Sequence, residues 1–383
     1  MPRRAIVHEP QYIDAPDAAE RFLASIGSAE TVALDTEAAS FHRFIDRIYL
    51  LQLSTRSATA ILDPLGIGKP ATLGTLLESP RVEVVFHDAD YDLRLLHQDY
   101  GWHASHLFDT RVAAQLLGIR TFGLAALLEK YLDVRLDKKH QRADWSQRPL
   151  PQDMLDYAAQ DTMYLLDLRD RLQEELERMG RWGWAREEFG RLEGTKWEPA
   201  ADDGSSFLRL KGARDLTRRQ LAILRELVAW RDGVARELDR ATFRVAGNEV
   251  LLEVARQAPR AVEALSAIKG MPRGIVERRG REVVDAVERG LAVPDDQLPK
   301  FPRSPRWDRD PDFETRVNRL RAAREKVAQW LDMDPGFLVS RERLETIARK
   351  RPKSVEELKA LDELRDWQIE VLGKPLLDAL AAE

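Results

Sequence analysis

The hydrophobic pattern of this 383-residue chain changes character once, and that change limits the folds open to it. Short runs rich in Val, Ile, Leu and Phe, typical of β-strands, occur only near the start, at 31–34, 48–54, 58–62 and 82–86. Helical spacing of apolar residues alternates with these runs, and after Leu216 it is the only pattern left. The sequence therefore predicts an α/β domain, a mixed sheet flanked by helices, followed by all-α units.

The expected helices and linkers divide the chain into four parts. The first contains helices at 89–98, 111–117 and 124–131 and a long helix from Pro151 to about residue 178, since proline suits a first helical turn. Residues 182–184 and 195–206 are typical of connecting segments. Later helices are expected at 216–238, 248–256, 260–268 and 280–291, and further ones over 313–380. The predicted domains are 1–205, 206–293 and 313–383, with a linker at 294–312.

The two helical units show weak similarity to each other at a spacing near 95 residues. Each begins with a long charged helix that carries a tryptophan near its end, Trp230 in one and Trp330 in the other. This pattern favours a duplicated domain over a solenoid.

The absence of cysteine and of long apolar runs excludes several classes of protein. Without Cys the chain cannot form disulfides, thiolate zinc sites, iron–sulfur clusters or a cysteine nucleophile. No apolar run approaches the ~20 residues that span a bilayer, and the first 20 residues lack the apolar core of a secretory signal. We expect a soluble, cytoplasmic protein without membrane contact, and a monomer fits the tandem helical units.

Charge is distributed unevenly along the chain, whose net charge is −5. Residues 1–200 carry 24 basic and 32 acidic side chains, whereas 207–293 carry 18 basic and 12 acidic. The basic clusters of the second segment comprise Lys211, Arg214, Arg218, Arg219, Arg273, Arg278, Arg279 and Arg281. The pattern fits a metal-holding enzyme with a module that contacts a polyanion, but random surface charge explains it equally well.

Two acidic motifs of the first domain are candidates for chemistry. Asp35 and Glu37 end the first strand as Asp-x-Glu, and residues i and i+2 of a strand point the same way. Their repulsion must be compensated by a cation or a proton. Asp92 follows the strand at 82–86 and lies in the first turn of the next helix. Solvated turn acids and a helix N-terminal acid are the structural alternatives.

A third motif, Tyr157-x-x-x-Asp161, lies in the expected long helix. Residues i and i+4 share one helix face, so a phenol and a carboxylate project side by side. An ordinary Tyr–Asp contact on an amphipathic helix explains the motif as well as a functional role does.

The acids indicate a particular protein family only when they are considered together. Asp-x-Glu, a middle Asp and Tyr-x-x-x-Asp, in this order, resemble the tyrosine-bearing branch of the DEDD exonuclease superfamily. The surrounding segments resemble the ribonuclease D family in particular; they read VALDTE, IYLLQLS, FHDADYDLRLL, LFDTRVAAQLLG, QRADWSQRPL and DYAAQDTMYLLDL. The helical units resemble HRDC domains, the helicase and RNase D C-terminal module.

The resemblance covers essentially the whole chain and implies a ribonuclease H-like exonuclease domain followed by two HRDC bundles. Two units in tandem resemble the bacterial enzymes.

The resemblance implies a reaction and roles for the matched residues. The activity would be a 3′→5′ exoribonuclease that releases 5′-monophosphate nucleotides with two Mg²⁺ or Mn²⁺ ions. Asp35 would bridge both ions, Glu37 and Asp161 would complete the site of the attacking water, and Asp92 would hold the ion on the leaving-group side. Tyr157 would orient the water. The implied substrates are tRNA precursors and other small structured RNAs with single-stranded 3′ ends.

Further residues are weaker candidates. Gln141, Arg142, Trp145 and Arg148 precede the helix of Tyr157 and could stack on a terminal base and hold its phosphate, or form a structural loop. Phe41 and His42 could wedge against the 3′ nucleotide. A structural role is favoured for His87, and Asp109 is expected to cap a helix or to support the metal ligands from behind.

Two other functions keep the same residues. The substrate could be DNA, as in a proofreading or repair exonuclease, although the tandem HRDC plan argues against it. The chain could also be an RNA-binding scaffold on an inactive nuclease fold, but all five matched positions hold competent residues. The RNA substrate, the processivity, the preferred metal and the selectivity for ribose are not determined at this level.

Overall fold

The computed structural model describes residues 9–136, 139–199, 204–302 and 310–382. The chain divides into two compact units, each of which is described separately. Unit 1 comprises the described residues of 1–37, 48–197 and 307–383, and unit 2 those of 38–47 and 198–306. The N-terminal residues 1–8 and part of the predicted linker, 303–309, lie outside the described residues.

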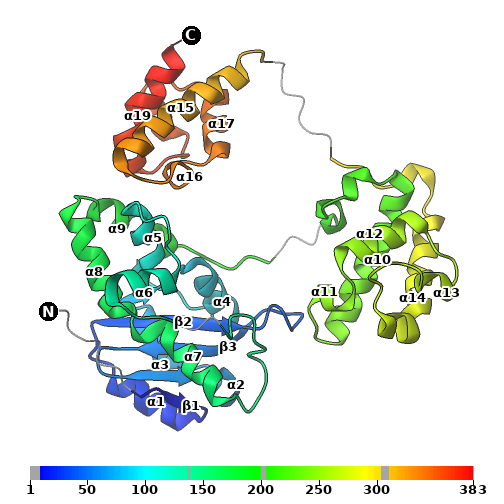
Figure 1. The fold of residues 1–383 in the computed structure, drawn as a ribbon, viewed down its shortest axis with the longest axis horizontal. Coiled ribbons are helices and arrows are strands. Elements are labelled where there is room, and N and C mark those ends of the chain that lie inside the picture. Colours follow the sequence, from blue (N-terminus) through cyan, green and yellow to red (C-terminus); the bar gives the residue numbers. More distant parts are fainter. Residues whose placement is uncertain (1–8, 137–138, 200–203, 303–309, 383) are drawn as a thin grey trace. The chain divides into compact units, whose positions relative to one another are not determined.

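Unit 1 contains a mixed sheet of six strands in the order β1-β4-β3-β2-β5-β6 (Figure 1). The strands are β1 (Gln11–Ile13), β2 (Thr31–Ala38), β3 (Ile48–Ser54), β4 (Thr59–Leu62), β5 (Glu83–Phe86) and β6 (Leu107–Asp109). β1 runs parallel to β4, and β3 is antiparallel to β4. β5 lies between β2 and β6 and runs parallel to both. The sheet confirms the predicted fold class.

The longer strands match the sequence prediction because their apolar runs are buried on both faces. All seven residues of β3 and all four of β5 are buried, as is typical of interior strands covered by helices. The sequence did not predict β1 and β6, which have three residues each and carry too few residues for a period-2 pattern.

Helices cover the sheet and extend beyond it. They are α1 (Pro16–Ser25), α2 (Pro64–Ile67), α3 (Ala71–Leu77), α4 (Asp90–Tyr100), α5 (Thr110–Leu116), α6 (Leu124–Leu132), α7 (Gln152–Met163), α8 (Leu165–Arg178) and α9 (Trp182–Leu192). The prediction of one helix from Pro151 to 178 was wrong, because the chain bends at Tyr164. The bend lets α7 pack on β3 and β4 while α8 packs on α5, α6 and β5. The connecting segment predicted at 182–184 was also wrong, since these residues begin α9.

The C-terminal helical module belongs to unit 1 and packs on α9. It consists of α15 (Phe313–Leu331), α16 (Pro335–Leu338), α17 (Arg341–Lys350), α18 (Val355–Ala360) and α19 (Asp366–Ala381). Arg181 is 7% exposed and donates to the carbonyls of Leu116 and Leu331, both at 2.6 Å. Trp184 stacks on Trp367 with ring centroids 5.0 Å apart. A buried cation that binds carbonyls of both partners fixes this docking, because water cannot replace the bonds.

Unit 2 contains the first helical module and the segment 38–47. Its helices are α10 (Arg218–Glu237), α11 (Thr242–Val245), α12 (Asn248–Gln257), α13 (Val262–Leu265) and α14 (Arg273–Ala292), with short 3-10 turns η1 (Ser206–Arg209), η2 (Ala213–Asp215) and η3 (Asp295–Gln297). Helix α10 begins with a capping box between Thr217 and Gln220. Helices α10 and α14 approach each other closely where Gly290 lies against the backbone of Ile223.

The two helical modules repeat each other in a constant register. α11, α12, α13 and α14 begin at 242, 248, 262 and 273, and α16, α17, α18 and α19 begin at 335, 341, 355 and 366, an offset of 93 throughout. The same offset relates Arg231 to Arg324, which are 7% and 8% exposed. It does not relate the two tryptophans noted in the sequence. Trp230 corresponds to Ala323, and Trp330 corresponds to Glu237.

Among the described residues, no helix is long and apolar enough to cross a membrane.

Two glycines test the packing of α10 on α14. A Cβ at Gly290 would lie 2.4 Å from Cα of Ile223, so Gly290→Ala forces the helices apart and should lower the free energy of unfolding of unit 2 by about 1–3 kcal/mol. Gly233, inside α10, has no atom within 4 Å of such a Cβ. Gly233→Ala should therefore raise that free energy by about 0.5–1 kcal/mol. Urea unfolding followed by circular dichroism measures both, and equal effects of the two substitutions would contradict the packing.

Candidate metal-dependent nuclease site

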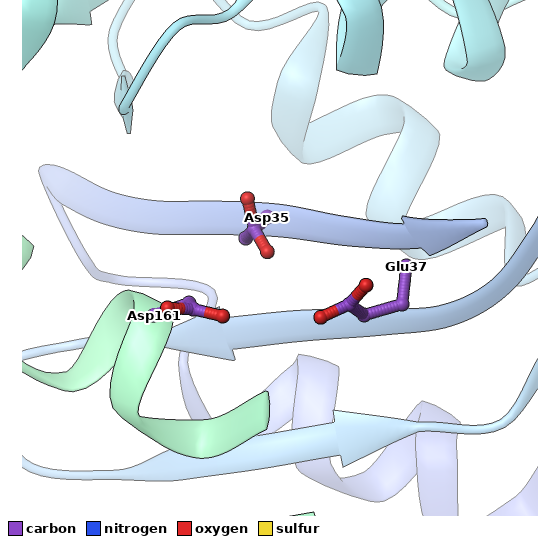
Figure 2. Close-up of side chains that lie close together, drawn as sticks. All are labelled: Asp35, Glu37 and Asp161. Atoms are coloured by element: carbon purple, nitrogen blue, oxygen red, sulfur yellow. The ribbon is translucent and has the colours of Figure 1, made fainter. Parts of the chain in front are cut away.

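Three carboxylates meet at the end of strand β2. Asp35 and Glu37 are two residues apart on this strand and therefore point to the same side. Helix α7, which packs on β3 and β4, brings Asp161 to them. Carboxylate oxygens of the three residues all lie within 4.8 Å of one another (Figure 2). Residues far apart in the sequence thus form one acidic cluster.

Asp92 joins the cluster through the residue between the two strand acids. Strands β2 and β5 are parallel, so helix α4, which follows β5, begins at the sheet edge where β2 ends. Asp92 lies in the first turn of α4 and is 6% exposed. Its Oδ1 accepts hydrogen bonds from the backbone N–H and the hydroxyl of Thr36, at 3.1 and 2.5 Å. Its Oδ2 has no hydrogen bond to any residue that the structure describes.

Burial and mutual repulsion raise the pKa of all four carboxyl groups. Desolvation is the largest cause in each case, and it raises the pKa of Asp35 well above its usual value, with the charge of Asp161 adding to it. The pKa of Glu37 is raised in the same way by burial and by the other three acids, and that of Asp92 by burial and Asp35. The pKa of Asp161 rises to about 7 through burial and the charge of Asp92. The four groups cannot all be ionised at neutral pH unless a cation compensates them.

Tyr157 lies one helical turn before Asp161 and is held by a second aromatic ring. The rings of Tyr157 and Trp145 are nearly parallel, at 29°, with centroids 6.1 Å apart. Trp145 is 1% exposed, so it supports the tyrosine from the interior and is not accessible to stack on a base. His140 packs edge-on against the same tyrosine at 5.7 Å. This packing limits the positions open to the phenol.

A cleft of about 460 Å³ opens onto the acids. Asp35, Tyr157 and Asp161 line it together with His87 and Gln141. The beginning of α6, at 123–126, forms another part of the lining. The sequence did not indicate residues 123–126 as part of the site, because glycine and apolar residues carry no reactive or charged group. Only the fold brings them to the cleft.

His87 is a neutral hydrogen-bonding group in this cleft. The hydroxyl of Thr110 donates to the carbonyl of Phe86 at 3.1 Å, so it accepts from Nδ1–H of His87 at 2.9 Å. Burial, with the charge of Arg111 adding to it, lowers the pKa of His87 to about 4. The imidazole is therefore uncharged at neutral pH, and the bond to Thr110 fits the structural role favoured for His87 from the sequence.

Asp109 caps helix α5 and also holds the turn that leads to α4. Its carboxylate accepts from the backbone N–H groups of Arg111 and Val112, at 2.8 and 3.1 Å, as expected for an N-cap. It also accepts from Asp88 and Ala89, at 3.2 and 2.8 Å. Asp88 has a φ of 70°, a conformation that needs such support outside glycine. One buried acid thus fixes the segment that carries Asp92.

Arg148 is engaged with the protein itself. It pairs with the buried carboxylate of Asp63 through Nε and Nη2, at 2.5 and 2.7 Å. Its remaining donors bind the carbonyls of Tyr49, Trp145 and Gln147, at 2.9, 2.8 and 2.6 Å. All five N–H donors of the guanidinium are used, which favours the structural alternative for Arg148 over the predicted phosphate contact.

The other two polar candidates of this segment differ in position. Gln141 lines the cleft, whereas Arg142 is exposed and is not part of the cleft lining.

The segment with Phe41 and His42 belongs to unit 2. Phe41 lies edge-on to Phe243 at 6.3 Å, and its carbonyl accepts from Nε of Arg244 at 2.5 Å. The carbonyl of His42 accepts from the backbone N–H of Ala241 at 3.2 Å. The predicted contact of Phe41 and His42 with the 3′ nucleotide stays a prediction.

Part of the basic charge predicted to contact RNA in the first helical module is engaged within that module. Arg219 binds Asp295 at 2.5 Å and Arg279 binds Glu237 at 2.9 Å. Arg281 pairs with Asp285 at 2.9 Å, and Arg218 donates to the carbonyl of Leu298 at 2.7 Å. These contacts leave less free charge than the sequence count indicated.

The donor set of the acidic cluster fits hard divalent cations. Buried carboxylate oxygens in close contact are ligands that Mg²⁺ and Mn²⁺ prefer, and the chain offers no thiolate that would favour a softer metal. Asp35, Glu37 and Asp161 form the compact part of the set, and Asp92 supplies a further oxygen.

The raised pKa of Asp161 predicts how the metal-free protein responds to pH. A carboxyl group whose pKa is higher in the folded than in the unfolded state stabilises the folded protein while it is protonated. This stabilisation is complete below the unfolded pKa, near 4, and is lost as the pH rises through about 7. In EDTA, Asp161→Asn should therefore raise the free energy of unfolding at pH 8 by on the order of 2–4 kcal/mol. The gain should shrink as the pH falls to 5. Chemical unfolding in EDTA at several pH values measures it, and a gain independent of pH would contradict the repulsion.

Comparisons with known protein families agree with this geometry. The family model described as 3′–5′ exonuclease matches residues 10–177, and the HRDC domain model matches 220–287 and 313–380. Ribonuclease D of Gluconacetobacter diazotrophicus is 32% identical over 352 residues, 90% of this chain and 86% of that protein. Ribonuclease D of Pseudomonas paraeruginosa is 31% identical over 91% of this chain and 92% of that protein.

A solved structure has the same fold over nearly the whole length. Escherichia coli RNase D, described as an exoribonuclease involved in structured RNA processing, superposes with a TM-score of 0.72 at 26% identity and covers 98% of this chain and 99% of that one. Sequence relatives, both domain types and the solved structure point to one conclusion: the chain belongs to the ribonuclease D family of 3′–5′ exoribonucleases.

Proposed function

We propose that the protein shortens RNA from its 3′ end, releases nucleoside 5′-monophosphates and uses two divalent cations, and that its substrates are tRNA precursors and other small structured RNAs. The observation that carries the proposal is the acidic cluster of Asp35, Glu37 and Asp161 beside a cleft that Asp35, Asp161 and Tyr157 line, with the buried Asp92 repelled by Asp35. The related Escherichia coli enzyme, which acts in structured RNA processing, supports the choice of substrate.

Each acid has a distinct position in the proposed site. Asp35 is electrostatically coupled to Glu37, Asp92 and Asp161, so we assign it to both cations. Glu37 and Asp161 would complete the first cation site. Asp92 would bind the second cation through Oδ2, because Thr36 holds its Oδ1. When bound, the cations supply an activated water and neutralise charge on the scissile phosphate.

Tyr157 would position the attacking water. A free phenol has a pKa near 10, so at neutral pH it acts as a hydrogen-bond donor and acceptor and not as a base. Packing between Trp145 and His140 fixes its ring near Asp161. Orientation of the attacking water therefore requires no proton transfer from that water to the tyrosine.

Removal of the Tyr157 hydroxyl tests this role. Tyr157→Phe keeps the ring packing but loses the hydrogen bond to the water, so kcat should fall about 10- to 100-fold with little change in KM. Tyr164→Phe, at the bend between α7 and α8 and outside the cleft lining, is the matched control and should retain kcat. Steady-state kinetics on a short unstructured RNA give both constants. A rise in KM alone would assign Tyr157 to substrate binding.

The proposed activity itself is tested with a stem–loop RNA that carries a 5′ label and a single-stranded 3′ tail. Mg²⁺ or Mn²⁺ should produce a ladder that shortens from the 3′ end and stalls near the stem, and EDTA should stop it. Asp35→Asn and Asp161→Asn should each abolish trimming and spare RNA binding, because each removes a cation ligand. Asp156→Asn, exposed on the same helix α7, is the control that should keep trimming.

The outcomes separate the remaining alternatives. Equal or faster shortening of the matched DNA would favour a DNA exonuclease. Tight binding of the RNA without cleavage would favour a scaffold. Trimming by purified Asp161→Asn would contradict the site.

A further inference from the structure

The second helical module contains an open groove between its two longest helices, α15 and α19. The groove encloses about 760 Å³. Its lining from α15 includes Arg319, Ala323, Lys326 and Trp330. The indole of Trp330 is 77% exposed, more than any other large hydrophobic side chain in the described part of the chain. An exposed aromatic ring beside an open, mostly apolar groove indicates a binding surface.

The first module fills the corresponding space. With the offset of 93, Ala323 corresponds to Trp230, which is 9% exposed and donates from its indole nitrogen to Glu282 at 3.0 Å. Pro375, which lines the groove, corresponds to that Glu282. In the second module an alanine thus replaces the filling indole, and a proline replaces its hydrogen-bond partner. The groove is open because its filling residue is absent.

The change between the modules also alters the charge of this surface. In the first module the matched positions include Glu226 and Glu237, which bind Arg289 at 3.2 Å and Arg279 at 2.9 Å. Arg319 and Trp330 stand at these two positions in the second module. Asp378 is the carboxylate of the groove lining, and the first module has Asp285 at the same position. Carboxylates have been replaced by a cation and an aromatic ring, a change that favours an anionic ligand with flat rings.

The cations of the groove are available to a ligand. Neither Arg319 nor Lys326 forms an ion pair or a side-chain hydrogen bond with any described residue, unlike the paired arginines of the first module. Arg319, Lys326 and Trp330 are seven and four residues apart along α15 and lie on one face of the helix. Free cations next to an exposed aromatic face form the combination that binds single-stranded nucleic acid without sequence preference.

We propose that this groove binds single-stranded RNA, with an unpaired base stacked on Trp330 and neighbouring phosphates bound by Lys326 and Arg319. The inference rests on the proposed function, because the ligand is the RNA that the enzyme shortens. It places a binding site for unpaired RNA on the second helical module, although the sequence shows its basic clusters in the first.

The test uses the full chain with Asp161→Asn, which prevents cleavage. Anisotropy of a 5′-fluorescein-labelled 20-nucleotide oligoadenylate gives Kd at several salt concentrations. Trp330→Ala should raise Kd about tenfold, and Trp330→Phe, which keeps an aromatic face, should raise it much less. Lys326→Gln should lower the slope of log Kd against log salt by about one. Lys350→Gln, an exposed lysine outside the groove lining, is the matched control and should leave the slope unchanged.

Two results would overturn the proposal. The first is that neither Trp330→Ala nor Lys326→Gln changes the Kd for the RNA, although thermal unfolding shows that both variants are folded. The other is a wild-type protein that dimerises in sedimentation equilibrium and becomes monomeric with Trp330→Ala, which would assign the groove to a second copy of the chain. Neither result affects the proposed function, which is tested separately by metal-dependent trimming of RNA and of the matched DNA by the wild-type protein.

Discussion

The repulsion among four carboxylates near the end of strand β2, one of them buried and three half-buried, is the constraint on which the rest of the catalytic domain depends. Asp35, Glu37 and Asp161 place their oxygens within 4.8 Å of one another, and burial raises the pKa of each. Such a cluster opposes folding unless protons or cations compensate it. The surrounding structure must therefore hold these acids in place against their mutual repulsion, and the same unfavourable charge makes the cluster compatible with divalent cations.

The supports of the cluster are buried polar and aromatic contacts from other elements. Thr36 holds Asp92 through two hydrogen bonds, and Asp109 fixes the turn before helix α4 through four backbone N–H groups. Trp145 supports Tyr157 from the interior. Because these contacts are buried, water does not replace them, and each supported side chain is restricted to a narrow range of positions. Geometry suited to the proposed reaction is thus present in the chain itself.

The two helical modules show how one fold acquires different surfaces. The last four helices of each module start at a constant offset of 93 residues, and a buried arginine recurs at the same offset, so their cores are built alike. Their surfaces differ at a few positions between the first and last long helices. Trp230 fills this space in one module, whereas Ala323 leaves it open beside Trp330 in the other. The overall charge of each module, which is basic in the first and nearly neutral in the second, does not reveal this difference, because Arg219, Arg279 and Arg281 of the first are paired internally.

The sequence alone determined the fold class and the repeat, and it supplied the candidate site residues. Long apolar runs such as 48–54 form strands wherever they are buried, and Asp-x-Glu on a strand and Tyr-x-x-x-Asp on a helix fix which side chains point together. Tertiary structure decided the rest. The bend at Tyr164, the helix at 182–192 and the internal use of Arg148 depend on partners distant in the sequence, which local periodicity does not report. The candidate acids come together only because parallel strands and the packing of α7 bring separate segments to one sheet edge.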